Sequence, residues 1–255
     1  MSHAKVLVHG GAHGAWCWEP VLPLLSSRSL AVDLPPKEVR GGLRGGPIPA
    51  SLATTRLDDF VRSTIADIDA AGIERFVLVG HSMGGLTIAE IAKRIPERVA
   101  QLVFVSCIVP AEGQTMVDGL PPDIREMTRA ALARARAGDV AALGVGTDAS
   151  LQRVMFCNDM TEEQTRFVLD RCGPEAPVVF EEEVRRKGIP PELPKTYVRL
   201  LRDQALTPGV QDEQIANLRG SPGGEVRVVE LDTAHDVMIS RPDLLAEVLN
   251  RIEGN

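Results

Sequence analysis

Residues 76–85 read Phe-Val-Leu-Val-Gly-His-Ser-Met-Gly-Gly, so that an apolar run meets a glycine-flanked serine, and an Ile/Leu/Ala-rich segment follows. Gly80, Ser82 and Gly84 occupy the fixed positions of the G-x-S-x-G pattern. A tight strand-to-helix turn strains the backbone of its apical residue and leaves room only for small neighbours. The stretch therefore predicts a nucleophile elbow, in which the Ser82 hydroxyl stands clear of the backbone.

Short apolar runs recur along the rest of the chain, separated by helical patterns. The strand candidates are Val6–Val8, Leu30–Val32, Phe76–Val79, Leu102–Val105, Tyr197–Leu201 and Val226–Leu231. Most of them are apolar throughout, as strands covered on both faces of a parallel sheet must be. Apolar stripes with a period of about 3.6 residues predict helices within 57–68, 86–95 and 244–252. Strands that alternate with helices predict the α/β class, with a doubly wound, mostly parallel sheet.

Residues 111–194 break this alternation, because no convincing strand precedes Val178. We expect this block to be a helical cap inserted over the carboxyl edge of the sheet. The remaining residues, 1–110 and 195–255, then form one core domain, which suits a chain of 255 residues. Two patterns predict helices in the cap: apolar spacing at Ile124, Met127, Ala131 and Ala135, and a capping box from Thr161 to Gln164.

The overall charge limits the partners that the protein is expected to bind. Lys and Arg number 28 against 35 Asp and Glu, which gives a formal charge of −7, and the pI is near 5.3. An acidic chain of this kind gives no reason to expect nucleic acid or an anionic membrane as a partner. No apolar run approaches the length of a transmembrane helix. The oligomeric state is open, with a homodimer as one alternative.

The cysteines and histidines give no signal for a metal site. The four cysteines are Cys17, Cys107, Cys157 and Cys172. They form no C-x-x-C pair, and Met1–Lys5 contain neither a charged leader nor a long apolar segment. We therefore expect free thiols in a reducing cytoplasm. The five histidines lack the spacing of zinc ligands, so neither a metal nor an organic cofactor is expected.

A serine nucleophile needs a base, and the base needs an orienting acid. In hydrolases with this elbow the three groups follow in the order serine, acid and histidine, each in a loop after a strand. His235 lies between the last predicted strand and the last predicted helix, and it is the only histidine after the elbow. We predict His235 as the catalytic base, with a surface histidine as the alternative.

The acid is expected one strand before the base. Asp203 directly follows the strand candidate at 197–201 and so takes that position. Its rivals are Asp212, Asp232 and Asp236. The first is expected inside a helix, and the other two are so close to the histidine in sequence that reaching its Nδ1 is awkward. We predict Asp203 as the acid, with a solvated surface carboxylate as the alternative.

Two backbone amides are needed to stabilise the oxyanion of acyl transfer. The amide of Met83, directly after the nucleophile, is one candidate donor. The loop after the first strand, residues 9–14, contains glycines that let the backbone approach a substrate, and we choose the amide of Gly11 as the second donor. His9 and His13 in this loop are expected to hold its shape rather than to take part in the chemistry.

Four stretches of the chain have the pattern of a known family. They are His9-Gly-Gly-Ala-His-Gly-Ala-Trp-Cys-Trp18, Gly80-His-Ser-Met-Gly-Gly85, Phe156-Cys-Asn-Asp159 and Arg202-Asp-Gln-Ala-Leu-Thr-Pro208. In them the chain resembles the plant methylesterase and hydroxynitrile lyase family, and more closely its bacterial esterase relatives. The resemblance implies the α/β-hydrolase fold, a cap that contributes the acyl or alcohol pocket, and these site residues: Ser82, Asp203 and His235 as the triad, with Gly11 and Met83 as oxyanion donors.

Departures from the lyases favour the esterase branch. The lyases carry a threonine where this chain has Gly10 and a lysine where it has Asp236, and they use both side chains on the cyanohydrin and the departing cyanide. An aspartate repels cyanide, and His81 also matches the esterases. Asp236 is unusual for the esterases too. A carboxylate beside His235 would raise the pKa of that histidine or favour a cationic or hydroxylated substrate, and a solvent-facing Asp236 is the alternative.

Together these residues predict a serine hydrolase that cleaves a small carboxylic ester through an acyl-enzyme on Ser82. The alternatives are a carbon–carbon bond hydrolase or a hydroxynitrile-lyase-like enzyme on the same triad, and a non-catalytic small-molecule binding protein. Activity is expected to fall on acidification near the ordinary histidine pKa of about 6.5. Candidates for lining the pocket, or for packing between cap and core, are Met116, Met155, Phe156 and Phe167. Cys107 is expected to be a small buried residue.

Overall fold

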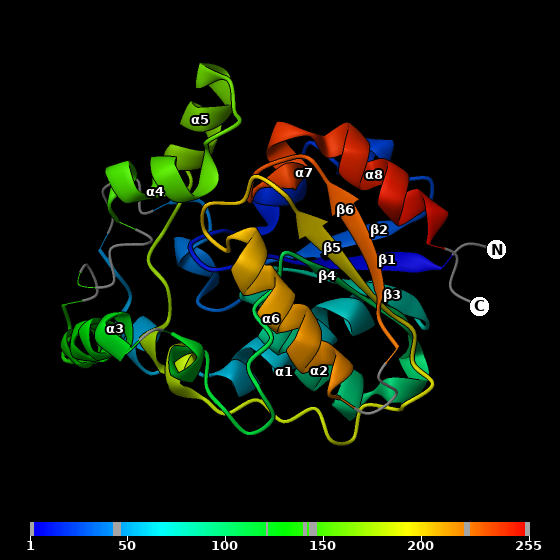
Figure 1. Ribbon diagram of the computed structural model, residues 1–255, viewed down its shortest axis with the longest axis horizontal. Coiled ribbons are helices and arrows are strands. Elements are labelled where there is room, and N and C mark those ends of the chain that lie inside the picture. Colours follow the sequence, from blue (N-terminus) through cyan, green and yellow to red (C-terminus); the bar gives the residue numbers. More distant parts are fainter. Residues whose placement is uncertain are drawn as a thin grey trace.

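The computed structural model of the protein describes residues 3–42, 47–120, 122–139, 142, 147–221 and 225–252, without the side chains of residues 123 and 124. Its core is a six-stranded parallel sheet with the strand order β2-β1-β3-β4-β5-β6 (Figure 1). The strands are β1 (Ala4–Val8), β2 (Ser29–Val32), β3 (Phe76–His81), β4 (Val99–Val105), β5 (Lys195–Leu200) and β6 (Arg227–Leu231). All the predicted strands are present, and the predicted α/β class is confirmed.

The direction in which strands are added to the sheet reverses between β1 and β3. β1 pairs with β2 on one side and with β3 on the other, and the later strands extend outward from β3. In open α/β sheets the crevice at the carboxyl ends of two such strands is the usual ligand site. The loop after β1 and the turn after β3 meet in this crevice, which brings residues 9–14 next to Ser82.

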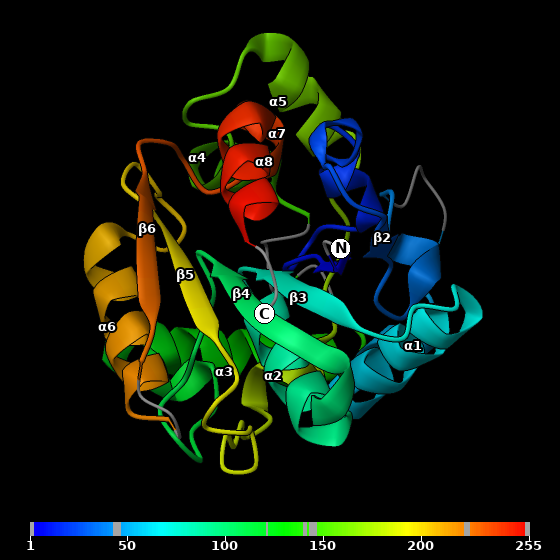
Figure 2. The same cartoon turned by 90° about the vertical axis from the view of Figure 1, so that its right-hand side faces the viewer.

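Alternate residues of each strand build the two halves of the core. In β3, Phe76 and Leu78 are buried on one face of the sheet, and Val77 and Val79 on the other. The helices that cover the first face are α1 (Leu57–Ala70), α2 (Gly84–Arg94) and α6 (Pro208–Arg219), and α8 (Pro242–Arg251) covers the second, as Figure 2 shows. The predicted helices at 57–68, 86–95 and 244–252 correspond to α1, α2 and α8.

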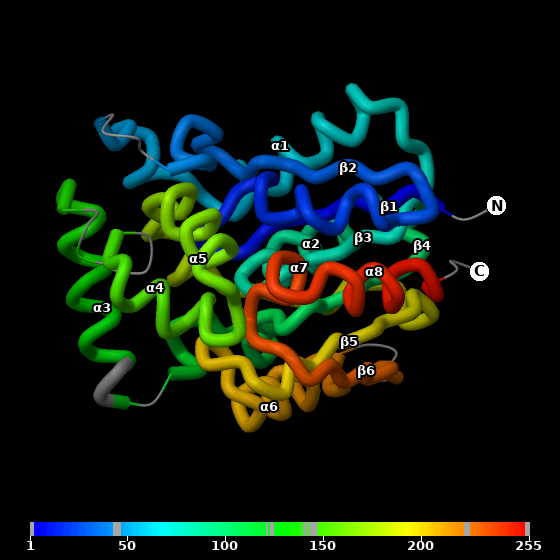
Figure 3. Tube along the Cα trace, turned by 90° about the horizontal axis from the view of Figure 1, so that it is seen from above, coloured from blue at the N-terminus to red at the C-terminus, as the bar shows by residue number. Residues whose placement is uncertain are grey.

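Helices also lie beyond the carboxyl ends of the strands, away from the point where β1 begins and α8 ends (Figures 1 and 3). They are α3 (Pro122–Arg136), α4 (Ala149–Phe156) and α5 (Glu162–Leu169). The capping box at the start of α5 is confirmed, because Gln164 N donates to Thr161 Oγ1 at 3.2 Å. The side chain of Ile124, one of the residues used to predict α3, lies outside the described part. The limits of the cap at 111–194 stay a prediction.

Two short helices are absent from the sequence prediction, namely α4 and α7 (Val237–Ser240). Both are too short to show a long apolar stripe, and each begins after a polar residue. Asp148 caps α4 by accepting from the amides of Ser150 and Leu151, and Asp236 precedes α7.

No helix in the described part of the chain is long and apolar enough to cross a membrane.

Candidate active site

The turn after β3 has the strained geometry that the elbow pattern predicts. Ser82 has a φ of +51°, in the left-handed region that residues other than glycine rarely adopt. A Cβ atom on Gly84 would lie 2.7 Å from the carbonyl oxygen of His9, and one on Gly85 would lie 2.7 Å from that of Ile108. Real Cβ atoms do not approach so closely, so both glycines are needed for α2 to pack beneath the turn.

His235 and Asp203 form a buried pair. Nδ1 of His235 donates to Oδ2 of Asp203 at 2.6 Å, and the two side chains are 2% and 0% exposed. Oδ1 of Asp203 accepts from the backbone amides of Ala205 and Leu206 at 2.7 and 2.8 Å. These bonds fix the carboxylate, and the carboxylate in turn fixes the tautomer and the orientation of the imidazole.

Ser106 is a further partner of this carboxylate that sequence reasoning does not single out. Its hydroxyl donates to Oδ2 of Asp203 at 2.6 Å. Ser106 directly follows β4 and has a φ of +40°. The available signal was its position, since a hydroxyl residue at the end of a central strand lies at the same edge of the sheet as the elbow.

The rival carboxylates on this side of the sheet are bonded elsewhere. Asp212 pairs with Arg199 at 2.8 Å, and Asp232 pairs with Arg202 at 3.1 Å. Both are well exposed, with side-chain fractions of 59% and 77%. Among the described aspartates, Asp203 is the one that bonds Nδ1 of the predicted base.

Ser82 and His235 line one cavity of about 530 Å³. In the described part of the chain, neither the Ser82 hydroxyl nor Nε2 of His235 has a hydrogen-bond partner, so both stay available; the bond between nucleophile and base is often loose in free enzymes. Gly11 and Met83 line the same cavity. No described acceptor bonds the amide of either residue, so the predicted nucleophile, the predicted base and two unoccupied donors meet at one place.

Most of the remaining lining of the cavity is apolar. It includes Met116, Leu120, Met155, Phe156 and Phe180. Among the described residues that line the cavity, none is a lysine or an arginine, and Glu213 is the single carboxylate. Of the four candidates from the sequence, Met116, Met155 and Phe156 line the cavity. Phe167 packs between cap and core instead, with its ring 5.6 Å from that of Trp16.

Asp236 is fully buried, so the solvent-facing alternative is wrong. Its Oδ2 lies 2.9 Å from Nε2 of His13. Burial alone would raise the pKa of Asp236, but the charge and hydrogen bond of His13, together with the two other histidines beside it, outweigh burial and hold that pKa below its ordinary value. Asp236 is not among the residues that line the cavity. This burial speaks against contact of Asp236 with a cationic or hydroxylated substrate, and its contacts are with neighbouring side chains.

The base is one of these neighbours. Burial disfavours the imidazolium and lowers the pKa of His235, but the carboxylates of Asp203 and Asp236 outweigh burial and raise that pKa above its ordinary value. We therefore expect the acid limb of activity at a pH above the ordinary histidine pKa.

His81, directly before the predicted nucleophile, contacts the predicted base. Its Nε2 donates to the carbonyl oxygen of His235 at 3.1 Å, and the two rings are 4.6 Å apart. Burial, together with the charge of His235, keeps the pKa of His81 well below its ordinary value, so the ring is neutral. Ligand atoms of His81, His235 and Asp236 lie within 4.8 Å of one another. Because Asp203 and His13 already bond two of these side chains, we interpret the cluster as a hydrogen-bonded network rather than as a metal site.

The two histidines of the loop after β1 hold its shape, as expected from the sequence. Nδ1 of His9 donates to the carbonyl oxygen of Gly10 at 2.8 Å, while its Nε2 accepts from the amide of Leu34 at 3.0 Å. Nδ1 of His13 donates to the carbonyl oxygen of Gly11 at 2.7 Å. Neither histidine is among the residues that line the cavity.

All four cysteines are buried free thiols. Burial raises the pKa of each thiol, in the case of Cys157 to about 11. Such thiols carry little thiolate and are poor nucleophiles. Sγ of Cys107 donates to the carbonyl oxygen of Gly80 at 3.0 Å, which agrees with its expected role as a small buried residue.

The stretch Phe156–Asp159 contacts the loops of both the acid and the base. Oδ2 of Asp159 accepts from the amide of Ala234 at 2.8 Å, and the Asn158 side chain donates to the carbonyl oxygen of Arg202 at 2.9 Å. The ring of Phe156 stacks 5.7 Å from that of His235. In the sequence this stretch stood out through the family resemblance, and its contacts show that it holds the two loops together.

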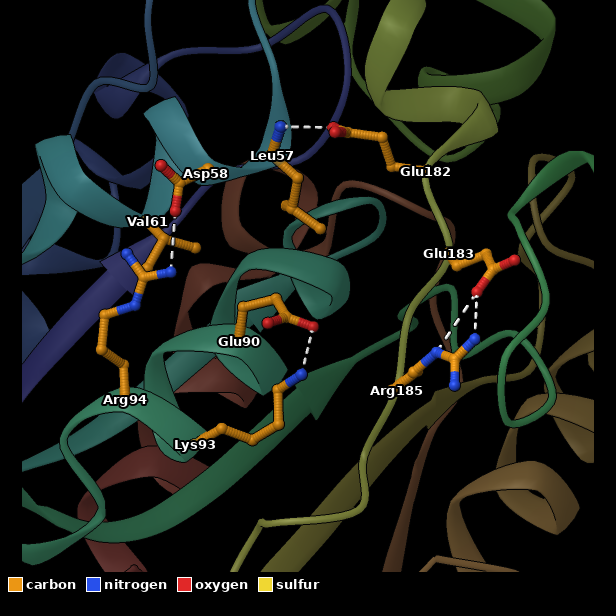
Figure 4. Close-up of a pocket in the computed structure, with 9 residues that line it drawn as sticks. All are labelled: Leu57, Asp58, Val61, Glu90, Lys93, Arg94, Glu182, Glu183 and Arg185. Carbon is orange, nitrogen blue, oxygen red and sulfur yellow. Dashed lines mark hydrogen bonds and ion pairs between the residues drawn. The ribbon is translucent and has the colours of Figure 1, made fainter.

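A second hollow, of about 250 Å³, lies between α1, α2 and residues 182–185 (Figure 4). We call it the charged groove. Its side chains pair with one another, as Figure 4 shows: Arg94 with Asp58, Lys93 with Glu90, and Arg185 with Glu183. Among the described residues that line it, none is a serine, cysteine or histidine. The described lining of the charged groove thus lacks a serine–histidine pair, and most of its charged side chains are bonded to one another.

The fold and the site together are typical of one class of hydrolases. Its marks are a parallel sheet, a strained serine turn after β3, and a histidine–carboxylate pair in the loops after β6 and β5. Comparison with known proteins supports this class. Residues 6–248 match the sequence profile of the Alpha/beta hydrolase family. The chain belongs to this family.

Within the family, the chain is related to plant methylesterases and to bacterial esterases. It is 28% identical to Esterase PIR7B of Oryza sativa subsp. japonica, over 97% of this chain and 94% of that protein. It is also 28% identical to the Carbendazim hydrolyzing esterase of Nocardioides sp. (strain SG-4G), over 96% and 97% of the two chains. An extracellular alpha/beta-hydrolase from a Paenibacillus species superposes with a TM-score of 0.79 over 99% of this chain and 100% of its own, at 20% identity, and so shares the fold.

Proposed function

We propose that the protein is a serine esterase that hydrolyses a small, uncharged carboxylic ester, with Ser82 as nucleophile, His235 as base and Asp203 as orienting acid. One observation carries the proposal. Nδ1 of His235 donates at 2.6 Å to the buried carboxylate of Asp203, and His235 lines the same cavity as Ser82.

The reaction proceeds in two halves. Oγ of Ser82 attacks the ester carbonyl carbon while Nε2 of His235 takes the hydroxyl proton, and the amides of Gly11 and Met83 bond the resulting oxyanion. The carbon–oxygen bond to the alcohol then breaks, and His235 returns the proton to the departing alkoxide. Water attacks the acyl-enzyme with the same base, which releases the carboxylic acid and restores Ser82.

The cavity lining supports an uncharged substrate. Its walls are mostly apolar, and no lysine or arginine is present among its described residues. A substrate carboxylate buried there would lose its hydration without gaining a cationic partner, which is costly. The relatives named above are esterases, which agrees with an ester bond as the target.

Two observations speak against the lyase alternative. A Cβ atom on Gly10 would lie 2.7 Å from Cβ of Ser82, so the threonine that the lyases carry has no room here. The residue after the base is a buried aspartate whose pKa lies below its ordinary value, so it is anionic where the lyases have a lysine. Both favour ester hydrolysis.

The test is turnover of a p-nitrophenyl ester of a short acid by the wild type and by Ser82→Ala. We expect the substitution to lower kcat by roughly 10⁴- to 10⁶-fold, because the other site residues cannot replace the nucleophile. The matched control is Ser63→Ala on α1, which should retain wild-type turnover. Near wild-type activity in Ser82→Ala would contradict the proposal.

Product analysis and covalent labelling separate the remaining alternatives. Release of an acid together with an alcohol supports the esterase, whereas an aldehyde or ketone formed without acid supports carbon–carbon chemistry. A fluorophosphonate probe should label the wild type and not Ser82→Ala. Absence of labelling in the wild type would favour a binding protein without a working nucleophile.

A further inference from the structure

Ala12 follows the proposed oxyanion donor Gly11, and its backbone is strained. Its φ is +65°, although it is not a glycine. Its side chain is 1% exposed. A residue other than glycine keeps such a conformation only when its surroundings hold it there, and strain of this kind concentrates at functional sites.

The segment 173–176, from the block predicted as the cap, supplies the bonds that hold Ala12. The amide of Ala12 donates to Oε2 of Glu175 at 3.1 Å, and its carbonyl oxygen accepts from the amide of Gly173 at 2.9 Å. The peptide between Gly11 and Ala12 is thereby bonded at both polar atoms, because His13 Nδ1 bonds the carbonyl oxygen of Gly11. Fixing this peptide plane holds the carbonyl side of Gly11. The amide of Gly11 lies in the preceding plane, whose Gly10 carbonyl oxygen accepts from His9 Nδ1 at 2.8 Å. With both planes held, the free amide of Gly11 has a fixed orientation.

Glu175 is itself held by Arg40 in a completely buried ion pair, with both side chains 0% exposed. Nη1 and Nη2 of Arg40 donate to the two carboxylate oxygens at 2.8 and 3.0 Å. The guanidinium also bonds the carbonyl oxygens of Leu34, Pro35 and His13, so every one of its N–H groups has an acceptor.

The Glu175 carboxylate faces four donors. Oε2 accepts from Ala12 and Arg40, and Oε1 accepts from Arg40 and from the amide of Ala176. A carboxylate accepts at both oxygens, whereas an amide presents an NH₂ group at one of them. Glutamine therefore cannot replace glutamate here without losing bonds.

We propose that Glu175 and Arg40 are positioning residues that hold the Gly11 amide in the geometry that an oxyanion requires. Glu175 bonds the Gly11–Ala12 peptide, and Arg40 fixes Glu175. This inference rests on the proposed esterase function. It adds that residues of the predicted cap, beyond shaping the pocket, complete the catalytic machinery of the core.

The test compares Glu175→Gln with the matched variant Glu182→Gln. Glu182 also lies in the predicted cap and also accepts from a core amide, that of Leu57 at 2.6 Å, and from Arg56, but at the charged groove rather than at residues 9–14 (Figure 4). The readouts are kcat per active site, counted by fluorophosphonate titration, and KM. We expect Glu175→Gln to lower kcat by at least about tenfold, because the Gly11 amide is misplaced. Complete loss of one oxyanion donor, which costs roughly hundredfold or more in kcat, sets the upper end of this range. KM should stay within about threefold of the wild type. Glu182→Gln should match the wild type.

A double variant, Arg40→Met with Glu175→Leu, separates positioning from stability. Apolar replacement of a buried ion pair commonly restores stability, but it leaves the Ala12 amide without an acceptor. We expect the Tm of the double variant to lie closer to the wild type than that of Glu175→Gln, while its kcat per site stays low. A trifluoromethyl ketone forms an adduct with Ser82 that carries an oxyanion. This inhibitor should bind the double variant more weakly, by the same factor as the loss in kcat. If kcat recovers together with Tm, the pair is only structural and the inference falls. If Glu175→Gln does not fold, the double variant decides alone.

These outcomes are independent of the test of the proposed function. An inactive wild type would refute the esterase. An active wild type whose Glu175→Gln variant keeps full kcat per site would refute only the positioning role.

Discussion

The catalytic cavity and the charged groove differ in what their polar groups are bonded to. In the charged groove, opposite charges pair with each other, as in Lys93–Glu90 and Arg94–Asp58, and these side chains are partly exposed to water. At the cavity, the carboxylates of Asp203 and Asp236 are buried behind the wall, while Nε2 of His235 and the amides of Gly11 and Met83 have no partner in the described chain. The density of charge does not distinguish an active site from a polar hollow. What distinguishes it is the presence of unpartnered donors and bases that the fold holds in place.

The largest effect that this comparison predicts in the cavity, beyond loss of the nucleophile itself, is that of Asp203→Asn. An amide at this position favours the wrong tautomer of His235 and does not stabilise its charged form, so kcat should fall by about 10⁴-fold. Steady-state kinetics with a p-nitrophenyl ester measure it, and Tm confirms folding. The control is Asp232→Asn, where the carboxylate is exposed and pairs with Arg202. Equal activities of the two variants would refute the assignment of the acid.

A shift in pH dependence is the next effect in size. The base must be neutral, and its pKa lies above the ordinary value because Asp203 and Asp236 outweigh burial. The value of kcat/KM should therefore fall as the pH drops through a midpoint above about 6.5. In Asp236→Asn one of the two carboxylates is gone, so the midpoint should move to lower pH. Asparagine can still bond His13, and His81 and Phe156 remain beside the ring. An unchanged or higher midpoint would show that Asp236 does not act on the base.

The smallest effect is expected in the charged groove. Lys93→Met removes one half of an ion pair between residues three apart on α2, with side chains about one-fifth exposed. Such a pair contributes about 0.5 kcal/mol or less to the free energy of unfolding. Activity should stay within about twofold of wild type, and urea denaturation should detect the small loss of stability. A large loss of activity would mean that the groove takes part in the reaction and would end the contrast between the two hollows.

The sequence could predict those side chains whose position depends on the end of a strand. Ser82, Asp203 and His235 each follow a strand in a fixed order, so position in the chain sufficed to bring them to one edge of the sheet. The strands themselves were predictable because burial on both faces makes them uniformly apolar. The pocket residues Met116 and Met155 were candidates only by composition.

What escaped prediction depends on pairs of residues far apart in the sequence. Glu175 and Arg40 are separated by 135 positions, and His13 and Asp236 by 223. Nothing local tells a buried carboxylate from a solvated one, which is why a solvent-facing Asp236 stood as an alternative. For Ser106 the strand end gives its place at the edge of the sheet, but its bond to Asp203 exists only once β4 and β5 lie side by side.

The contact between Gly10 and Ser82 restricts how this scaffold can change its chemistry. Because even a methyl group at position 10 would press on the nucleophile at 2.7 Å, a hydroxyl-bearing residue cannot be introduced there alone. Evolution or engineering toward cyanohydrin cleavage would first have to separate the ends of β1 and β3. We expect a single substitution at this position to disturb the serine turn rather than to give a new activity.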